Sequence, residues 1–288
     1  MNDATLTYNP QPSTPALKLP AGACDSHVHV FGPAARFPFS PERHITPADA
    51  PKEKLFALHK HLGISRCVIV QSAIHAFDNA AAEDAIAAGG GHYLGVALTP
   101  PDVSDRELER LKAAGFRGIR FNFMPHLAGS ATPEQAVALS RRLEKLDMHL
   151  QVHFASNLIH SIASILKTSS VPVVIDHMGR VDATLGPDHA DFSALCRLME
   201  DPLFHVKVSG TDRIDATPPY RHGLMLARKL VESFPDRCFW GTDWPHPNHT
   251  HIPDDGMLVD ILPEIAPTPE LLEKLLVTNP QRFYRFEA

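Results

Sequence analysis

The sequence predicts an α/β protein whose strands and helices alternate eight times around a closed (β/α)8 barrel, the TIM-barrel architecture. Eight short apolar runs recur along the 288 residues, with starts roughly 20 to 40 residues apart, and helical patterns fill most of the intervals. Several runs are continuously hydrophobic, as parallel strands buried on both faces require. An open, doubly wound sheet is the alternative, but it needs a glycine-rich phosphate-binding turn after its first strand. No such turn follows the first run.

The expected strands, in chain order, are Cys24–Val30, Arg66–Gln71, Tyr93–Thr99, Arg117–Phe123, Leu150–Phe154, Val171–Asp176, His205–Ser209 and Cys238–Gly241. Between them, Lys52–Leu62 and Glu134–Leu146 place apolar residues at three- and four-residue spacings, which is typical of a helix with one buried face. Asn157–Lys167 and Leu224–Ser233 are amphipathic in the same way. The pattern therefore predicts helices that cover the outside of the strands.

Two of the expected helices carry recognisable start signals. Ser104 with Glu107 fits a capping box, in which a hydroxyl and a carboxylate satisfy the first free amide groups. Thr132 with Gln135 fits the same pattern, and Pro133 suits the first helical turn. These signals predict helices that begin just after positions 104 and 132.

The domain organisation is expected to be simple. Residues 1–20 are polar and contain several prolines, so we expect an extended N-terminal segment. Residues 21–288 then form one barrel domain, a length that such barrels commonly reach. We find no internal repeat and no linker within them.

Composition excludes several classes of protein. Hydrophobic residues make up 44% and charged residues 21%, close to the globular average, which excludes disorder and coiled coil. The net charge of -6, without long basic runs, argues against a nucleic-acid partner. No apolar run approaches a membrane span. Four scattered cysteines without a CxxC motif, and a start without signal-peptide features, predict a cytoplasmic protein with free thiols.

The active site of such a barrel forms at the carboxyl ends of the strands. The first run ends in His27 and His29, which lie two residues apart and therefore point to the same side. The fourth run carries Arg120 and the fifth carries His153. The eighth run leads to Asp243. These side chains are predicted to converge on one end of the barrel.

Other polar residues near the strand ends are expected to have supporting or structural roles, with one exception. Asp25 and Asp176 are expected to make hydrogen bonds behind the site rather than to bind substrate or metal. The sixth run also leads to His177, which joins the converging histidines. His59 and His61 lie on a predicted helix, and we expect them on the surface.

Taken together, the histidines and the aspartate point to a hydrolytic centre. Imidazole and carboxylate groups suit Zn²⁺ or a similar divalent ion. A metal with an open position lowers the pKa of a bound water towards 7, which makes hydroxide available at neutral pH. A single histidine at a strand end is more often structural, so the prediction rests on the convergence.

Five segments extend this interpretation. They are DSHVHVFGP at 25–33, RGIRFNF at 117–123, PVVIDHMGR at 172–180, GTDWPHPN at 241–248 and PDDG at 253–256. They resemble the amidohydrolase superfamily and, within it, the branch of 2-pyrone-4,6-dicarboxylate lactonases, over about residues 23–284. The resemblance implies a distorted (β/α)8 barrel of the amidohydrolase type. It also implies hydrolysis of a cyclic ester from aromatic compound breakdown, with Asp243 activating the water.

One departure from that branch bears on the metal. The pyrone lactonases carry tyrosine at the strand-five position and work without a metal, whereas this chain has His153. The change implies a ligand set for one Zn or Mn ion, with metal-independent catalysis as the alternative. That set is His27, His29, His153 and Asp243. His177 would then polarise the substrate or handle a proton.

The same resemblance implies a pocket for a small anionic substrate. Arg120 and Arg213 match arginines that hold substrate carboxylates, and Arg120 is also expected to act in catalysis. Ser72, His246 and Asn248 are further expected substrate contacts.

Three hypotheses on function follow. The first is a lactonase acting on 2-pyrone-4,6-dicarboxylate or a muconolactone-type compound, with Asp243 as general base. The second is a metal-dependent decarboxylase or amidase of the same superfamily acting on an aromatic or cyclic acid. The third is a non-catalytic binding protein on a barrel scaffold. The sequence identifies neither the lactone nor the oligomeric state.

Overall fold

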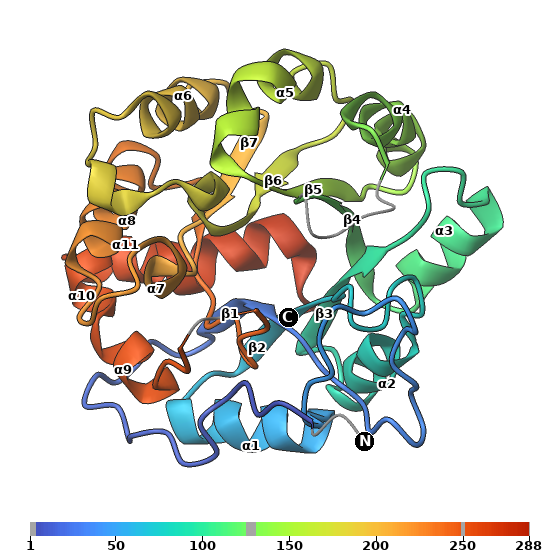
Figure 1. Ribbon diagram of the computed structural model, residues 1–288, viewed down its shortest axis with the longest axis horizontal. Coiled ribbons are helices and arrows are strands. Elements are labelled where there is room, and N and C mark those ends of the chain that lie inside the picture. Colours follow the sequence, from blue (N-terminus) through green and yellow to red (C-terminus); the bar gives the residue numbers. More distant parts are fainter. Residues whose placement is uncertain (1–3, 125–130, 249–250, 288) are drawn as a thin grey trace.

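The computed structural model describes residues 4–124, 131–248 and 251–287. Within them, eight parallel strands form one sheet in the order β1 to β8, and Figure 1 shows them as a ring with helices outside. The strands are β1 Cys24–Val28, β2 Arg66–Val70, β3 Tyr93–Leu98, β4 Phe116–Phe123, β5 His149–Phe154, β6 Val173–Ile175, β7 Phe204–Lys207 and β8 Cys238–Phe239. The predicted (β/α)8 barrel is confirmed.

The ring is distorted where it closes. Seven neighbouring pairs of strands form parallel ladders. Between β8 and β1, the described residues contribute separate backbone hydrogen bonds instead, including Ser26 N to Trp240 O at 2.8 Å and Asp243 N to His27 O at 2.8 Å. The closing seam is therefore made by the segments that carry the predicted site.

Helices surround the strands. They are α1 Lys52–Leu62, α2 Ala80–Ala88, α3 Asp105–Ala113, α4 Pro133–Glu144, α5 Ile159–Leu166, α6 Ala190–Met199, α7 Thr211–Ile214, α8 Arg221–Ser233, α9 Asp255–Asp260, α10 Leu262–Ile265 and α11 Pro269–Glu273. Short 3-10 turns cover 156–158 and 183–185, a left-handed turn covers 176–180, and π-helical turns cover 274–278 and 281–285. No helix among the described residues is long and apolar enough to cross a membrane.

The helix starts follow the predicted caps. The Ser104 side chain accepts a hydrogen bond from Glu107 N at the start of α3. Thr132 and Gln135 form a complete capping box at the start of α4, where Pro133 occupies the first turn. Both arrangements satisfy amide groups that the helix leaves free.

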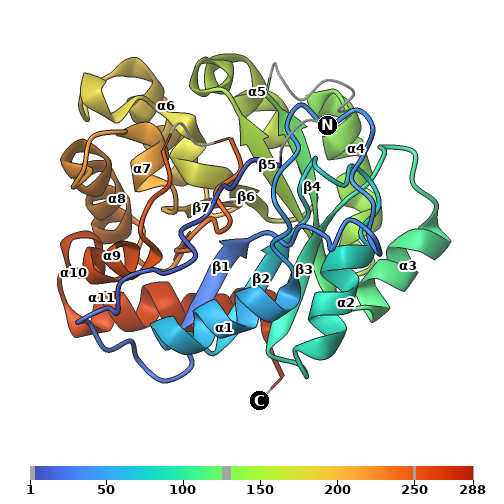
Figure 2. The ribbon, with the colours of Figure 1, turned by 60° about the horizontal axis from the view of Figure 1, so that its bottom comes forward.

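The core has two layers. Apolar side chains between strands and helices form the larger layer, while Val68, Val70, Val96 and Val174 point inside the ring with the aromatic ring of Tyr284. Figure 2 shows the last helical segment crossing beneath the strands, at the end opposite the strand tips. This segment closes the bottom of the barrel, which leaves the upper end for the site.

The N-terminal segment is extended and runs outside α1. The ring of Tyr8 lies 5.3 Å from the ring of Trp244. Ser13 Oγ donates a hydrogen bond to Asp254 at 2.6 Å, and Leu17 N donates to Asp260 at 2.9 Å. The segment is thus fastened to the loop that follows β8 and to α9.

Candidate active site

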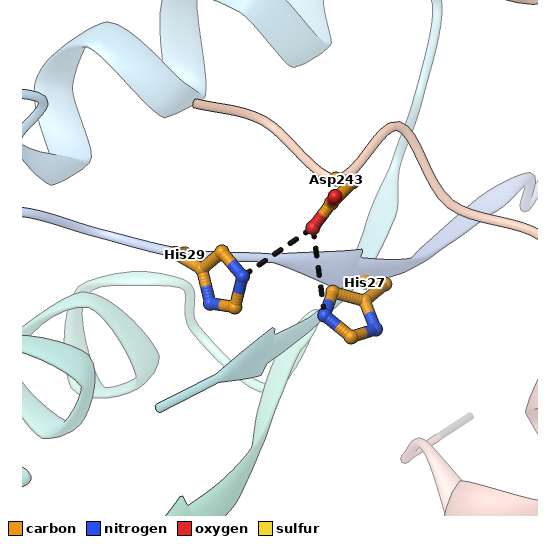
Figure 3. A group of neighbouring side chains, drawn as sticks. All are labelled: His27, His29 and Asp243. Carbon is orange, nitrogen blue, oxygen red and sulfur yellow. Dashed lines mark ion pairs between the residues drawn. The ribbon is translucent and has the colours of Figure 1, made fainter. Parts of the chain in front are cut away.

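Three predicted ligands meet at the seam between β1 and β8. His27 Nε2, His29 Nε2 and a carboxylate oxygen of Asp243 lie close together, and the ligand atoms of this group are within 4.8 Å of one another. Asp243 Oδ1 is 3.6 Å from His27 Nε2 and 3.4 Å from His29 Nε2. Figure 3 shows the carboxylate facing both imidazoles. All three residues are buried.

The buried carboxylate of Asp25 fixes this geometry from behind. Its Oδ1 accepts hydrogen bonds from His27 N and Thr242 N, both at 3.1 Å, and its Oδ2 accepts one from Thr242 Oγ1 at 2.6 Å. Gly241 allows the two segments to approach, because a Cβ there would lie 2.5 Å from His27 N. Asp25 therefore makes hydrogen bonds behind the site, the place that the sequence predicted for it.

The protonation of His29 suits a metal ligand. Its Nδ1 lies 2.6 Å from the carbonyl oxygen of Val70, which can only accept, so Nδ1 carries the proton and Nε2 has a free lone pair. His27 Nε2 and Asp243 Oδ1 are buried without a hydrogen-bond partner among the described residues. Two imidazoles and one carboxylate are a common donor set for zinc. The residues present therefore fit one divalent ion.

His153 lies outside this group of three. It is buried on β5, its Nδ1 is 3.2 Å from Asn122 Oδ1, and its ring centre is 5.6 Å from that of His177. The structure thus brings together three of the four predicted ligands. His153 faces the same cavity from across the barrel.

Asp243 is an ionised carboxylate at neutral pH. Burial, the largest single influence, raises its pKa, but the Arg213 guanidinium and the three neighbouring histidines together outweigh burial, so the pKa of this carboxyl lies well below its usual range. Arg213 Nε donates to Asp243 Oδ2, and another nitrogen of the same group donates to Pro247 O at 2.8 Å. Burial also lowers the pKa of His27 to about 3, so this imidazole is neutral.

His177 reaches the site from a left-handed turn that follows β6. Its φ is 47°, a conformation that non-glycine residues rarely adopt and that is concentrated at functional sites. The Nε2 atom lies 3.8 Å from Asp243 Oδ1, and Nδ1 lies 3.1 Å from Ser209 Oγ. Burial lowers the pKa of His177 well below the ordinary value. A neutral imidazole therefore stands beside the Asp243 carboxylate.

Arg120 and Asp176 form a buried pair behind the histidines. Arg120 Nε donates to Asp176 Oδ2 at 2.8 Å, and Gln151 Nε2 donates to Oδ1 at 2.9 Å. Burial raises the pKa of Asp176, but Arg120, His27 and Lys207 together outweigh burial and hold the pKa well below the usual range. Asp176 thus lies behind the site, as the sequence predicted, and it orients Arg120.

A small cavity opens above these groups. Its volume is about 30 Å³, room for one or two water molecules. His44 Nε2 and Asn248 Oδ1 are 2.5 Å apart and form part of its wall. Its lining consists of His29, His44, Ser72, Ala73, Arg120, His153, His177, Arg213, Asp243, Pro247 and Asn248. The predicted substrate contacts Ser72, Arg120, Arg213 and Asn248 therefore share one cavity.

His246 does not line that cavity. Its side chain is buried, and its Nε2 lies 3.0 Å from Asp255 Oδ1 in the PDDG segment. Burial lowers the pKa of His246, but the charge and hydrogen bond of Asp255, together with the charges of Asp212 and Asp243, outweigh burial and raise it. The role of this pair is to tie the turn after Asp243 to the start of α9, so the structure does not support His246 as a substrate contact.

The expectation for His59 was wrong. The side chain is buried, with Nδ1 2.8 Å from the Tyr93 hydroxyl and Nε2 3.6 Å from Asp25 Oδ2. Position 59 follows Leu55 by four residues and precedes Leu62 by three, so it falls on the apolar face of α1. His61 does lie on the surface, with its Nε2 3.0 Å from Ser13 O.

Three site residues were not predicted. Lys207 is fully buried at the end of β7, where a lysine within an apolar run was a usable signal. Burial lowers its pKa to about 8. Arg180 follows the turn of His177, and burial with the charge of Arg213 lowers its pKa to about 10. His44 comes from a long loop, whose path no sequence pattern revealed.

Comparison with known proteins agrees with this geometry. The amidohydrolase family profile matches residues 24–286, so the chain belongs to that family. It is 45% identical over 290 residues to a 2-pyrone-4,6-dicarboxylate hydrolase of Comamonas testosteroni, covering 97% of this chain and 95% of the relative. It is 40% identical over 271 residues to a 4-sulfomuconolactone hydrolase of Hydrogenophaga intermedia, covering 92% and 89%. A solved Pseudomonas putida protein, a candidate 2-pyrone-4,6-dicarboxylic acid hydrolase, superimposes with a TM-score of 0.81 at 29% identity, covering 94% and 100%.

Proposed function

We propose that this protein hydrolyses a small carboxylated lactone, 2-pyrone-4,6-dicarboxylate or a related muconolactone. The observation that carries the proposal is the ionised Asp243 carboxylate at the wall of a cavity that Arg120 and Arg213 also line. A carboxylate provides a base, and guanidinium groups bind carboxylates through paired hydrogen bonds. The two relatives named for lactone hydrolysis support the same reaction class.

In this mechanism Asp243 moves the proton. A water held against its carboxylate attacks the lactone carbonyl carbon, and Asp243 takes the proton that the water loses. The ring C–O bond then breaks, and Asp243 returns the proton to the leaving oxygen. The net change is the addition of one water across the ester bond. Arg213 and the neighbouring histidines keep the carboxylate ionised before each turnover.

Arg120 and His177 are assigned to the carbonyl. Both line the cavity, and negative charge develops on the carbonyl oxygen during attack. Arg120 donates to Asp176 through Nε, which leaves its other guanidinium nitrogens for the substrate. Arg213 is assigned to a substrate carboxylate. Ser72 and Asn248 complete the contacts at the rim.

One divalent ion, Zn or Mn, fits His27, His29 and Asp243. When bound there, such an ion lowers the pKa of water and polarises a carbonyl. His153 contributes to the cavity wall, from which its Nε2 can donate to or accept from the substrate. The 30 Å³ cavity is smaller than a pyrone dicarboxylate, so we infer that the contact between His44 and Asn248 opens when substrate enters.

The test is a substrate panel on the purified protein. Loss of the ring absorbance of 2-pyrone-4,6-dicarboxylate and of a muconolactone is followed together with acid release and carbon dioxide release. We expect acid release that matches ring opening, without carbon dioxide. Carbon dioxide release from an aromatic acid, with the lactones left intact, would contradict the proposal and favour the decarboxylase. Opening of a cyclic amide to an amino acid, with the lactones left intact, would favour the amidase.

A further inference from the structure

A buried amine lies beneath His27, and the mechanism above does not use it. Lys207 stands at the end of β7 with no exposed surface. Its Nζ is 3.3 Å from His27 Nδ1 and 3.7 Å from Asp176 Oδ1. Burying a lysine nitrogen is costly unless it has a partner, so these two contacts define its role.

The Asp176 carboxylate is already engaged by other groups. Arg120 Nε donates to Oδ2, and Gln151 Nε2 donates to Oδ1. Lys207 Nζ lies within hydrogen-bond distance of His27 Nδ1 at 3.3 Å, whereas its 3.7 Å contact with Asp176 Oδ1 is an ion pair. A lysine nitrogen beside an imidazole is a donor, so His27 Nδ1 must accept, and the ring proton is then on Nε2.

His29 has the opposite arrangement. The Val70 carbonyl oxygen holds the proton on His29 Nδ1 and leaves Nε2 as a lone-pair donor. In His27 the Nε2–H instead faces Asp243 Oδ1 at 3.6 Å, which is too long for a hydrogen bond, and a protonated ring nitrogen cannot bind a metal. The other tautomer of His27 is available through Asp176 Oδ1, which lies 3.3 Å from Nδ1. Two partners thus compete for one nitrogen.

We propose that Lys207 is a positioning residue that favours the Nε2–H tautomer of His27 and so weakens divalent metal binding by His27, His29 and Asp243. The proposal rests on the assignment of those three residues as a metal group. Metal can bind only after the His27 proton shifts to Nδ1 and is accepted by Asp176. Lys207 therefore lowers the metal affinity of the site formed by His27, His29 and Asp243. The groups behind metal-binding histidines commonly change metal affinity by about 10- to 100-fold.

The first test reads the tautomer without metal or substrate. Histidine ring nitrogens are labelled with ¹⁵N, and two-bond nitrogen–proton correlations are recorded on metal-free protein at pH 7.5. The His27 signals are assigned by their loss in His27→Gln. We expect an Nε2–H tautomer in the wild type and an Nδ1–H tautomer in Lys207→Met, in which Asp176 is the remaining partner. An Nδ1–H tautomer in the wild type overturns the proposal without any variant at Lys207.

The second test measures zinc affinity by competition with a chromophoric chelator. Lys207→Met is expected to bind Zn²⁺ about tenfold more tightly than the wild type. Lys145→Met, which changes an exposed lysine, is the matched control and is expected to bind as the wild type does. Equal affinities of wild type and Lys207→Met, within twofold, would overturn the proposal. Neither test uses turnover, so failure of the lactonase assay and failure of this proposal are separate outcomes.

Discussion

Replacing Asp25 tests how the two halves of the site are held together. Its carboxylate accepts hydrogen bonds from His27 N, Thr242 N and Thr242 Oγ1, and it has no exposed surface. Asp25→Ala removes both acceptor oxygens and leaves three buried donors without partners. Each such donor costs roughly 1–3 kcal/mol, so even the low end of that range predicts a loss of about 3 kcal/mol in the free energy of unfolding.

The loss is measured by urea unfolding at pH 7.5, with thermal unfolding as a second readout. For a chain of this size, about 3 kcal/mol corresponds to a fall of roughly 6 °C in the melting temperature. Asp105→Ala is the control, because that side chain is 76% exposed and pairs with Arg142 on the surface. It is expected to stay within about 0.5 kcal/mol of the wild type.

Asp25→Asn refines the interpretation. The amide oxygen still accepts from His27 N and Thr242 N, so this variant is expected to lose less stability than Asp25→Ala. A loss below about 1 kcal/mol in Asp25→Ala would refute the reasoning, because three buried donors cannot all lose their acceptor at so small a cost. Equal losses in the alanine and asparagine variants would show that the two amide contacts do not matter.

Two further predictions concern the same seam. Gly241→Ala places a Cβ 2.5 Å from the His27 backbone nitrogen. We therefore expect a lower free energy of unfolding and at least a tenfold loss of kcat/KM. Wild-type values of both quantities would contradict this prediction. The pKa of His246 is raised by Asp255 against the effect of burial. The pair therefore contributes its full stabilisation below the unfolded-state pKa of histidine, about 6.5. This stabilisation is lost as the pH rises through the pKa of His246 in the folded protein. The stability difference between wild type and Asp255→Asn should therefore shrink from pH 6 to pH 9, and a difference that grows over this range would contradict the assignment.

Much of the fold was predictable because local patterns and topology agree. Continuous apolar runs identify strands covered on both faces, and the helix α1 begins and ends where its periodicity does. The main differences lie at β6 and β8, which are shorter than their apolar runs. After Ile175 the chain enters a left-handed turn, and after Phe239 it joins β1 through separate hydrogen bonds. Such strained segments depend on tertiary contacts rather than on residue preference.

The site was predictable where strand position alone determines it. His27, His29 and Asp243 meet because neighbouring strands end side by side. That His153 lies outside the group of three depends on the position of β5 in the barrel, which sequence spacing does not reveal. His246 lies in a turn whose direction is set by its contact with Asp255. Side chains from loops and from the opposite wall therefore required the structure.

The most direct measurement of the central claim is turnover of 2-pyrone-4,6-dicarboxylate by wild type and Asp243→Asn. General acid–base catalysis commonly contributes about 10²- to 10⁴-fold, and Asp243 acts on both the attacking water and the leaving oxygen. We therefore predict ring opening by the wild type and a loss of about a thousandfold in kcat for Asp243→Asn, with the far-UV circular dichroism unchanged. Activity of the folded variant within tenfold of the wild type would contradict the role of Asp243.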